Sequence, residues 1–145
     1  MITAEKARDC LVRHPFTEVM EAIVMAALGE EGFGRLVSAF YRRVREDDLI
    51  GPMYPDGDWE GAERRLDDFL IFRFGGSERY IQERGHPRLR MRHFPFAIGS
   101  VERNAWLGHM LAAVRSAPVH LPVEVEALFV DYFERASAAM INQNR

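Results

Sequence analysis

The sequence predicts an all-α fold, and three observations support that prediction. Apolar residues recur at three- and four-residue spacing in several separate stretches, as they do along one face of a helix. Gly and Pro cluster at only a few points between these stretches. No segment shows the strict alternation of a half-buried strand. With 145 residues, 48% of them hydrophobic, the chain is long enough for one domain with a substantial core.

The first two predicted helices occupy residues 17–29 and 33–44. Thr17 is a suitable N-cap for the first, which runs to about Gly29. The second has the clearest apolar stripe, made by Phe33, Leu36, Val37, Phe40, Tyr41 and Val44.

A loop and a third helix follow. Residues 51–58, GPMYPDGD, hold two Pro and two Gly and are predicted to be a loop, and Asp58 is placed to cap the next helix. That helix ends at the Gly75-Gly76 pair, where a left-handed backbone conformation costs little. Its apolar stripe consists of Ala62, Leu66, Phe69 and Leu70.

The stretch 75–99 is predicted to be the least regular part of the domain. Ser77 is placed to cap a short helix to residue 84, and residues 88–93 form one or two turns that Pro95 ends. An irregular stretch rich in His, Arg, Gly and Pro inside a compact helical domain is a candidate functional segment.

Two long helices complete the chain. Ser100 is placed to cap the first, which runs to about Arg115, and its apolar residues are Val101, Ala105, Trp106, Met110 and Val114. The second begins near Pro122, a favourable first-turn residue. Its stripe consists of Val125, Leu128, Phe129, Tyr132, Phe133, Ala136 and Met140.

Composition disfavours several classes of protein. The net charge of -3 argues against a general nucleic-acid binder. No apolar run approaches the roughly 20 residues that span a bilayer, and the first residues lack the apolar core of a signal peptide. The single cysteine, Cys10, allows neither an intrachain disulfide nor a four-thiolate metal site. We therefore expect a cytoplasmic protein without membrane or nucleic-acid partners.

Among five histidines, His93 is distinguished by its neighbours, because Phe94, Pro95 and Phe96 follow it directly. An imidazole beside an apolar patch suits an axial ligand of haem. An ordinary surface or core role is the more common one for any single histidine, however. The arginines at 84, 88, 90 and 92 suit the carboxylates or phosphates of a ligand, or simply a solvated face. Spacing alone does not rank haem above a generic ligand.

Residues 75–107, GGSERYIQERGHPRLRMRHFPFAIGSVERNAWL, resemble the signature of the group II truncated haemoglobins, a branch of the globin superfamily. The resemblance continues upstream through AFYRRV, MYP and GAERRLDDFL and covers about residues 28–135. It implies a two-on-two helical sandwich around haem b. Residues 19–145 would then form the globin domain, and residues 1–18 an N-terminal extension.

The resemblance also implies roles for individual residues. His93 matches the proximal iron ligand, and Tyr41, Tyr54 and Trp106 match distal residues that hydrogen-bond the gas ligand. Ala62 falls at the distal position that is a histidine in many ordinary globins. The implied haem pocket also includes Phe40, Leu66, Phe69, Leu70, Phe96 and Ile98, and the implied propionate partners are Arg65, Tyr80 and Arg92.

A globin of this kind is expected to bind dioxygen and other diatomic ligands. Hydrogen-bond donors slow the release of bound dioxygen, which carries partial negative charge. Slow release favours redox chemistry, such as nitric oxide dioxygenation or peroxide reduction, over bulk transport. An external reductant is expected, since the sequence has no flavin or nicotinamide motif. Whether the protein is an enzyme stays open, as does the choice between monomer and homodimer.

Two alternatives remain at this point. One is a haem-based gas sensor or interaction module that acts through a partner, with residues 1–18 as its output. The other is a zinc- or anion-binding helical domain that uses His86, His93 and the arginines. Gly and Pro separate these two histidines, so they lack the usual helical spacing of metal ligands.

Overall fold

The structure is a computed structural model that describes residues 17–54, 57–116 and 118–144. Within these ranges every regular element is a helix, which confirms the predicted all-α fold. No helix in the described ranges is both long enough and apolar enough to span a membrane. The predicted extension, residues 1–18, and Cys10 lie outside the described residues, except that Thr17 and Glu18 begin the first described helix.

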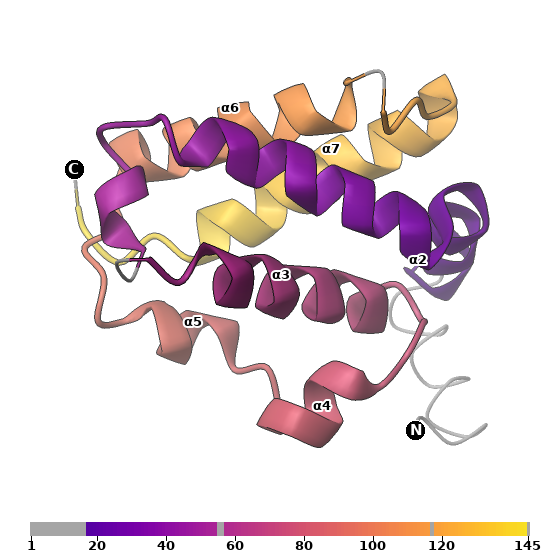
Figure 1. The fold of residues 1–145 in the computed structure, drawn as a ribbon, viewed down its shortest axis with the longest axis horizontal. Helices are drawn as coiled ribbons and strands as arrows, with labels where there is room; N and C mark the ends of the chain where they lie inside the picture. The colour runs from indigo at the N-terminus through magenta and orange to yellow at the C-terminus, as the bar shows by residue number, and fades with distance from the viewer. Residues whose placement is uncertain (1–16, 55–56, 117, 145) are drawn as a thin grey trace.

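Helices α2 and α3 form one pair of a two-on-two sandwich, and α6 and α7 form the other. α2 packs against α3, α6 and α7, and α6 packs against α7. The short helices α4 and α5 lie beyond α3 along one edge of the molecule (Figure 1). The element bounds are α2 Thr17–Val44, η1 Gly51–Met53, α3 Trp59–Arg73, α4 Arg79–Arg84, α5 Leu89–His93, α6 Ser100–Val114 and α7 Val123–Ala139.

Glycines set two of the predicted helix boundaries. Gly29 has φ 64° and ψ 174°, so it kinks α2 where the sequence predicts the end of one helix before the next. α3 ends in a Schellman motif, because the N–H of Gly75 donates to the Phe72 carbonyl (3.1 Å) and that of Gly76 to the Ile71 carbonyl (2.8 Å). Gly75 has φ 87°, as this motif requires. The prediction that this glycine pair ends the helix is confirmed.

Aromatic rings fill the core between the two helix pairs. The Phe129 ring contacts Phe33 edge-on, with centroids 6.0 Å apart, and Phe74 at 5.2 Å. It also stacks on Phe133, 5.2 Å away in the same helix. Phe33, Phe129 and Phe133 are at most 1% exposed. This packing fixes α7 against α2 and the end of α3, so the next turn of α7 can form a wall of the functional cavity.

The predicted caps at Asp58, Ser77 and Ser100 differ from those observed. Asp58 occupies the N-cap position of α3, but its carboxylate accepts no backbone N–H of the helix and contacts the Arg65 side chain at 3.2 Å instead. Ser77 lies one residue before the N-cap of α4, since its hydroxyl accepts the Arg79 N–H (3.2 Å) in a local turn.

The prediction that Ser100 caps α6 is also one residue off. Gly99 is the N-cap, and the Glu102 carboxylate accepts its N–H at 2.7 Å. Val101 was expected in the apolar stripe of this helix, but it is 56% exposed. At about 100° per residue, the separation of nine positions between Val101 and Met110 places the two on opposite faces. Met110 is fully buried, so Val101 faces outward.

Candidate functional site

A cavity of about 420 Å³ lies between α3, α5, α6 and α7. This volume falls within the range of about 300–1,000 Å³ that is usual for ligand and cofactor sites. Almost all of the predicted site residues line it. They are His93, Tyr41, Tyr54, Trp106, Ala62, Leu66, Phe69, Leu70, Phe96, Ile98, Arg65, Tyr80 and Arg92.

Phe40 is the one predicted pocket residue that does not line the cavity. Its side chain is fully buried behind the wall. Its ring contacts Tyr41 at 4.9 Å and Trp106 at 5.3 Å between centroids. Phe40 therefore supports two of the cavity's polar residues from behind.

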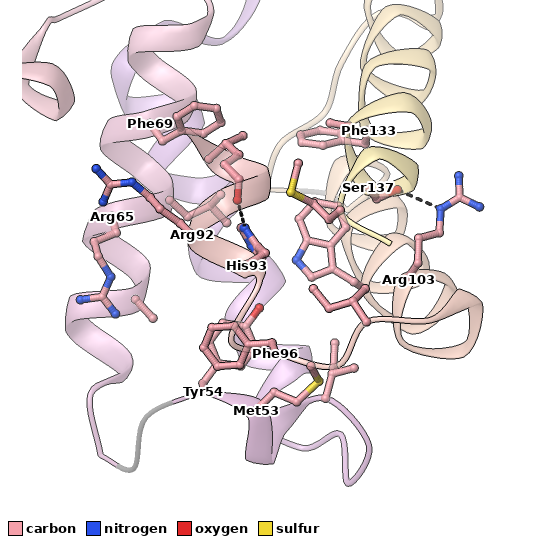
Figure 2. A pocket seen from close by; sticks show the side chains of 18 of the residues that line it. Met53, Tyr54, Arg65, Phe69, Arg92, His93, Phe96, Arg103, Phe133 and Ser137 are labelled. Carbon is pink, nitrogen blue, oxygen red and sulfur yellow. Dashed lines mark hydrogen bonds between the residues drawn. The ribbon is translucent and has the colours of Figure 1, made fainter. Parts of the chain in front are cut away.

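His93 is the last residue of α5 and its side chain points into the cavity (Figure 2). Its Nδ1 lies 2.6 Å from the Leu89 carbonyl oxygen, four residues earlier in the same helix. A carbonyl can only accept, so Nδ1 must carry the proton and donate it. In the neutral imidazole this tautomer leaves the lone pair on Nε2, the nitrogen that can bind a metal. Leu89 thus fixes both the tautomer and the orientation of the ring.

The segment after His93 is held by the C-terminal residues, a contact that the sequence analysis did not predict. Asn142 Nδ2 donates to the Phe96 carbonyl at 2.8 Å and to the His93 carbonyl at 3.3 Å. Its Oδ1 accepts the Ile98 N–H at 2.9 Å. The last described residues accordingly lie beside the connection from α5 to α6 (Figure 1). Asn142 fixes the backbone that carries His93, Phe96 and Ile98.

Tyr41, Tyr54 and Trp106 bring three polar groups into the cavity, next to apolar residues of its wall. Burial raises the pKa of Tyr54 to about 12, although hydrogen bonds from Tyr41 and Trp106 act in the opposite direction. Burial, and then the charge and hydrogen bond of Tyr54, raise the pKa of Tyr41. Both phenols are therefore protonated at neutral pH. The hydroxyls of Tyr41 and Tyr54 and the indole N–H of Trp106 can each donate to a ligand in the cavity.

Apart from Arg65 at the mouth, the residues that α3 contributes to the cavity wall include no side-chain donor among Ala62, Leu66, Phe69 and Leu70. Ala62 is buried and ends in a methyl group. Leu66, Phe69 and Leu70 continue the same wall toward α4. A small ligand beside these apolar residues would therefore meet its donors on the side of α2, α6 and the segment around Tyr54.

A second feature that the sequence analysis missed holds that segment in place. His109 Nε2 and Asp47 Oδ2 are 2.5 Å apart, and Arg43 donates through Nε to His109 Nδ1 at 3.3 Å. The other carboxylate oxygen of Asp47 accepts the N–H groups of Leu49 (2.7 Å) and Ile50 (3.1 Å). The hydrogen bond with His109 lowers the pKa of Asp47. This cluster ties the segment that leads to Tyr54 onto α6, the helix that carries Trp106.

Arginines stand at the mouth of the cavity. Arg65 contacts Asp58, while Arg92 donates to the carbonyls of Arg84 (2.8 Å) and His86 (3.3 Å). Arg84 also lines the cavity, although the sequence analysis placed it only within the run of arginines. Figure 2 shows Arg65 and Arg92 on one side and Arg103 on the other. Such guanidinium groups suit the carboxylates of an amphipathic ligand.

Arg103 is a further cavity residue that was not predicted. It donates to the Ser137 hydroxyl at 3.0 Å and to the Glu134 carbonyl at 2.8 Å, both on α7. The sequence offered a signal, since Arg103 precedes Trp106 by three residues and so shares its helix face.

His86 and His93 do not form the zinc site that the sequence left open. His86 Nδ1 accepts the Arg88 N–H at 3.2 Å, away from the His93 ring. In the described part of the chain, no three His, Cys, Asp or Glu side chains gather as metal ligands would. The single imidazole of His93 is the best-placed metal ligand in the cavity.

The family model for bacterial-like globins matches residues 23–141. The chain belongs to the bacterial-like globin family. It is 38% identical over 117 residues to the group 2 truncated haemoglobin YjbI of Bacillus subtilis, a match that covers 81% of this chain and 86% of that protein. This confirms the predicted resemblance to the group II truncated haemoglobins.

Solved structures agree with this assignment. The thermostable haemoglobin of Thermobifida fusca is 46% identical with a TM-score of 0.79, over 84% of this chain and 98% of the other. The truncated oxygen-avid haemoglobin of Bacillus subtilis is 35% identical with a TM-score of 0.75, over 82% of this chain and 98% of the other. The predicted two-on-two fold is therefore confirmed, and family membership supports a haem-based gas-binding protein.

The observed cavity fits the haem that this family implies. Its walls are mainly apolar, as a porphyrin requires, and one imidazole lines the interior with its Nδ1 bonded to Leu89. Arginines at the mouth suit the two propionates, and hydrogen-bond donors suit a gas ligand.

Proposed function

We propose that this globin binds haem b through His93 Nε2, holds dioxygen against Tyr41, Tyr54 and Trp106, and uses it to oxidise nitric oxide to nitrate. One observation carries the proposal. A single imidazole, with Nδ1–H committed to Leu89, shares an apolar cavity with three side-chain donors. Bound haem supplies an iron centre that takes a diatomic ligand, and the chain decides how that ligand is held.

His93 has the proximal role in this proposal. The Leu89 carbonyl keeps the proton on Nδ1 and orients the ring, which makes Nε2 a better ligand. Asn142 holds the backbone on the C-terminal side of the same residue. Arg65, Tyr80 and Arg92 hold the propionates, and Arg84 joins them at the mouth of the cavity.

Tyr41, Tyr54 and Trp106 have the distal role. A hydrogen bond to a charged acceptor contributes about 1.5–3 kcal/mol, so each donor that reaches dioxygen slows its release substantially. The rings of Tyr41 and Tyr54 lie 5.6 Å apart between centroids, so their hydroxyls can act on the same ligand. Slow release suits a protein that reacts with dioxygen better than one that delivers it.

Oxidation of nitric oxide balances as one nitric oxide, one dioxygen and one electron giving one nitrate. We assign the electron to an external protein reductant. The chain's part is to exclude water through the apolar wall of Leu66, Phe69 and Leu70, and to keep dioxygen oriented until nitric oxide diffuses in.

The test is a stopped-flow reaction of the reduced, oxygenated protein with nitric oxide, with nitrate measured at the end. We expect one nitrate per protein, and a slower or incomplete reaction in Tyr41→Phe. Rapid loss of dioxygen without nitrate would contradict the oxidation of nitric oxide. Turnover of peroxide in place of nitrate formation would assign the alternative reaction, peroxide reduction.

A further inference from the structure

The segment around α5 has a charge opposite to that of the rest of the chain. Residues 84–97 contain four arginines and no Asp or Glu, a net charge of +4. The whole chain has 19 Lys and Arg against 22 Asp and Glu, so the remainder has 15 against 22, or -7. Arg88 and Arg90 form no ion pair with any carboxylate in the described residues. Their charge is therefore presented to solvent.

Apolar side chains are exposed on the same segment. Leu89 and His93 line the cavity, four residues apart on one face of α5. Arg90, Met91 and Phe94 occupy the opposite face, because Phe94 continues the helical backbone at φ -54° and ψ -37°. Met91 is 54% exposed and Phe94 is 62% exposed. We call Arg88, Arg90, Met91 and Phe94 the α5 face.

We propose that the α5 face is the docking surface for an acidic electron-transfer protein that reduces the haem. This proposal rests on the redox function proposed above. An apolar centre beside charged groups is a common arrangement in protein interfaces, and weak redox encounters bury less than about 1,200 Å². A patch of this size, on a helix of five residues, matches that class better than a permanent interface.

The position of the α5 face gives it a role in electron transfer. Only the single helix α5 separates this part of the cavity from solvent. His93 lies on its inner side, and the next residue, Phe94, lies on its outer side. α5 also lies at the edge of the molecule, where a second protein can approach it (Figure 1). A partner docked here would lie close to the proposed iron ligand. Arg88 and Arg90, which the cavity does not use, would also orient an acidic partner during its approach to a chain of overall negative charge.

The experiment measures the reduction of the ferric haem-loaded protein by reduced flavodoxin, a small acidic flavoprotein, in a stopped-flow instrument. Arg90→Glu is compared with Arg42→Glu, which makes the same charge change. Arg42 is exposed on α2, which lies across α3 from α5 (Figure 1). Arg88→Asn is added to Arg90→Glu, because Arg88 has φ 41° and asparagine tolerates that conformation. Phe94→Ser tests the apolar part.

We expect Arg90→Glu to lower the second-order rate about tenfold at low ionic strength, and Arg42→Glu to change it less than about twofold. The added Arg88→Asn should lower it further, and high salt should abolish the differences. Phe94→Ser should lower the rate at every salt concentration. Equal effects of Arg90→Glu and Arg42→Glu would overturn the proposal, since only the net charge would matter.

Two controls separate this proposal from its alternatives. Dithionite should reduce wild type and all variants at equal rates, and a wild-type protein that dithionite cannot reduce would refute the proposed redox function itself. Sedimentation of wild type and Arg90→Glu tests self-association. A wild-type dimer that this variant dissociates would assign the α5 face to a second copy of the chain and overturn the docking proposal.

Discussion

Replacing Trp106 by Phe removes one N–H donor from the cavity and keeps an aromatic ring at its wall. The ring contacts with Phe40 (5.3 Å) and Phe133 (5.9 Å) are apolar, so phenylalanine can retain most of them. A hydrogen bond to a charged acceptor contributes about 1.5–3 kcal/mol. At about 1.4 kcal/mol per tenfold change, dioxygen should leave the variant about 10–100 times faster.

The assay is stopped-flow displacement of dioxygen by excess carbon monoxide. Trp59→Phe is the matched control, because Trp59 lies 5.4 Å from the Tyr54 ring and 6.1 Å from Tyr41 but does not line the cavity. It should change the rate less than about twofold. Carbon monoxide accumulates little negative charge when bound, so its own release should change far less than that of dioxygen in Trp106→Phe. Unchanged dioxygen release in Trp106→Phe, or an equal change in Trp59→Phe, would refute the assignment.

Three further predictions concern groups outside the distal cavity. Burial, and then Asp68, raise the pKa of Asp67 to about 6, and its buried Oδ1 has no hydrogen-bond partner. Its ionisation therefore costs stability as pH rises through about 6. Asp67→Asn should raise the free energy of unfolding, measured in urea, by about 1–3 kcal/mol at pH 7.5. Below about pH 4, where Asp67 is protonated, the substitution should give no gain. Ionisation of Asp47 has the opposite effect on stability. Because its pKa is lowered, the ionised group stabilises the fold at neutral pH, and this stabilisation is lost as pH falls through that pKa. Asp47→Asn should thus be about 1 kcal/mol less stable at neutral pH, with a deficit that shrinks below about pH 4. Asn142→Ala, measured by haem transfer to apomyoglobin, should lose haem about tenfold faster, because it frees the backbone after His93.

Each of these predictions has a result that would contradict it. A gain in Asp67→Asn that is as large at pH 4 as at pH 7.5 would mean that ionisation is not the cause. A pH-independent deficit in Asp47→Asn would indicate lost packing instead of a lost charged hydrogen bond. Haem loss from Asn142→Ala at the wild-type rate would show that the C-terminal contact does not steady the proximal side.

The sequence predicted the helices well where local patterns determine them. The stripe of residues 33–44 became a buried face of α2, and the glycine pair at 75–76 became a Schellman motif, because spacing and φ preferences act within a few residues. Errors arose where a side chain had a competing partner. Asp58 bonds to Arg65, and Ser77 closes a turn, instead of capping the helices. Val101 shows that apolar character without the right helical phase does not predict burial.

The cavity lining was predicted mainly through the family resemblance. The resemblance assigned residues that are distant in the chain, such as Tyr41 and Trp106, to the same site. The contacts that support the site were not predicted. Asp47 and His109 are 62 positions apart, and Asn142 is 49 positions from His93. Polar contacts over such separations leave no periodicity or local motif in a single sequence. They become visible only when the fold brings their helices and loops together.

Ligation by His93 is the central claim, and the visible spectrum of His93→Gly, with and without imidazole, tests it most directly. Wild-type protein loaded with haem should show the intense band near 400 nm that is general to haem proteins. We expect His93→Gly to lose or shift this band, and added imidazole to restore it by occupying the space of the missing side chain. An unchanged band in His93→Gly, without imidazole, would show that another residue ligates the iron.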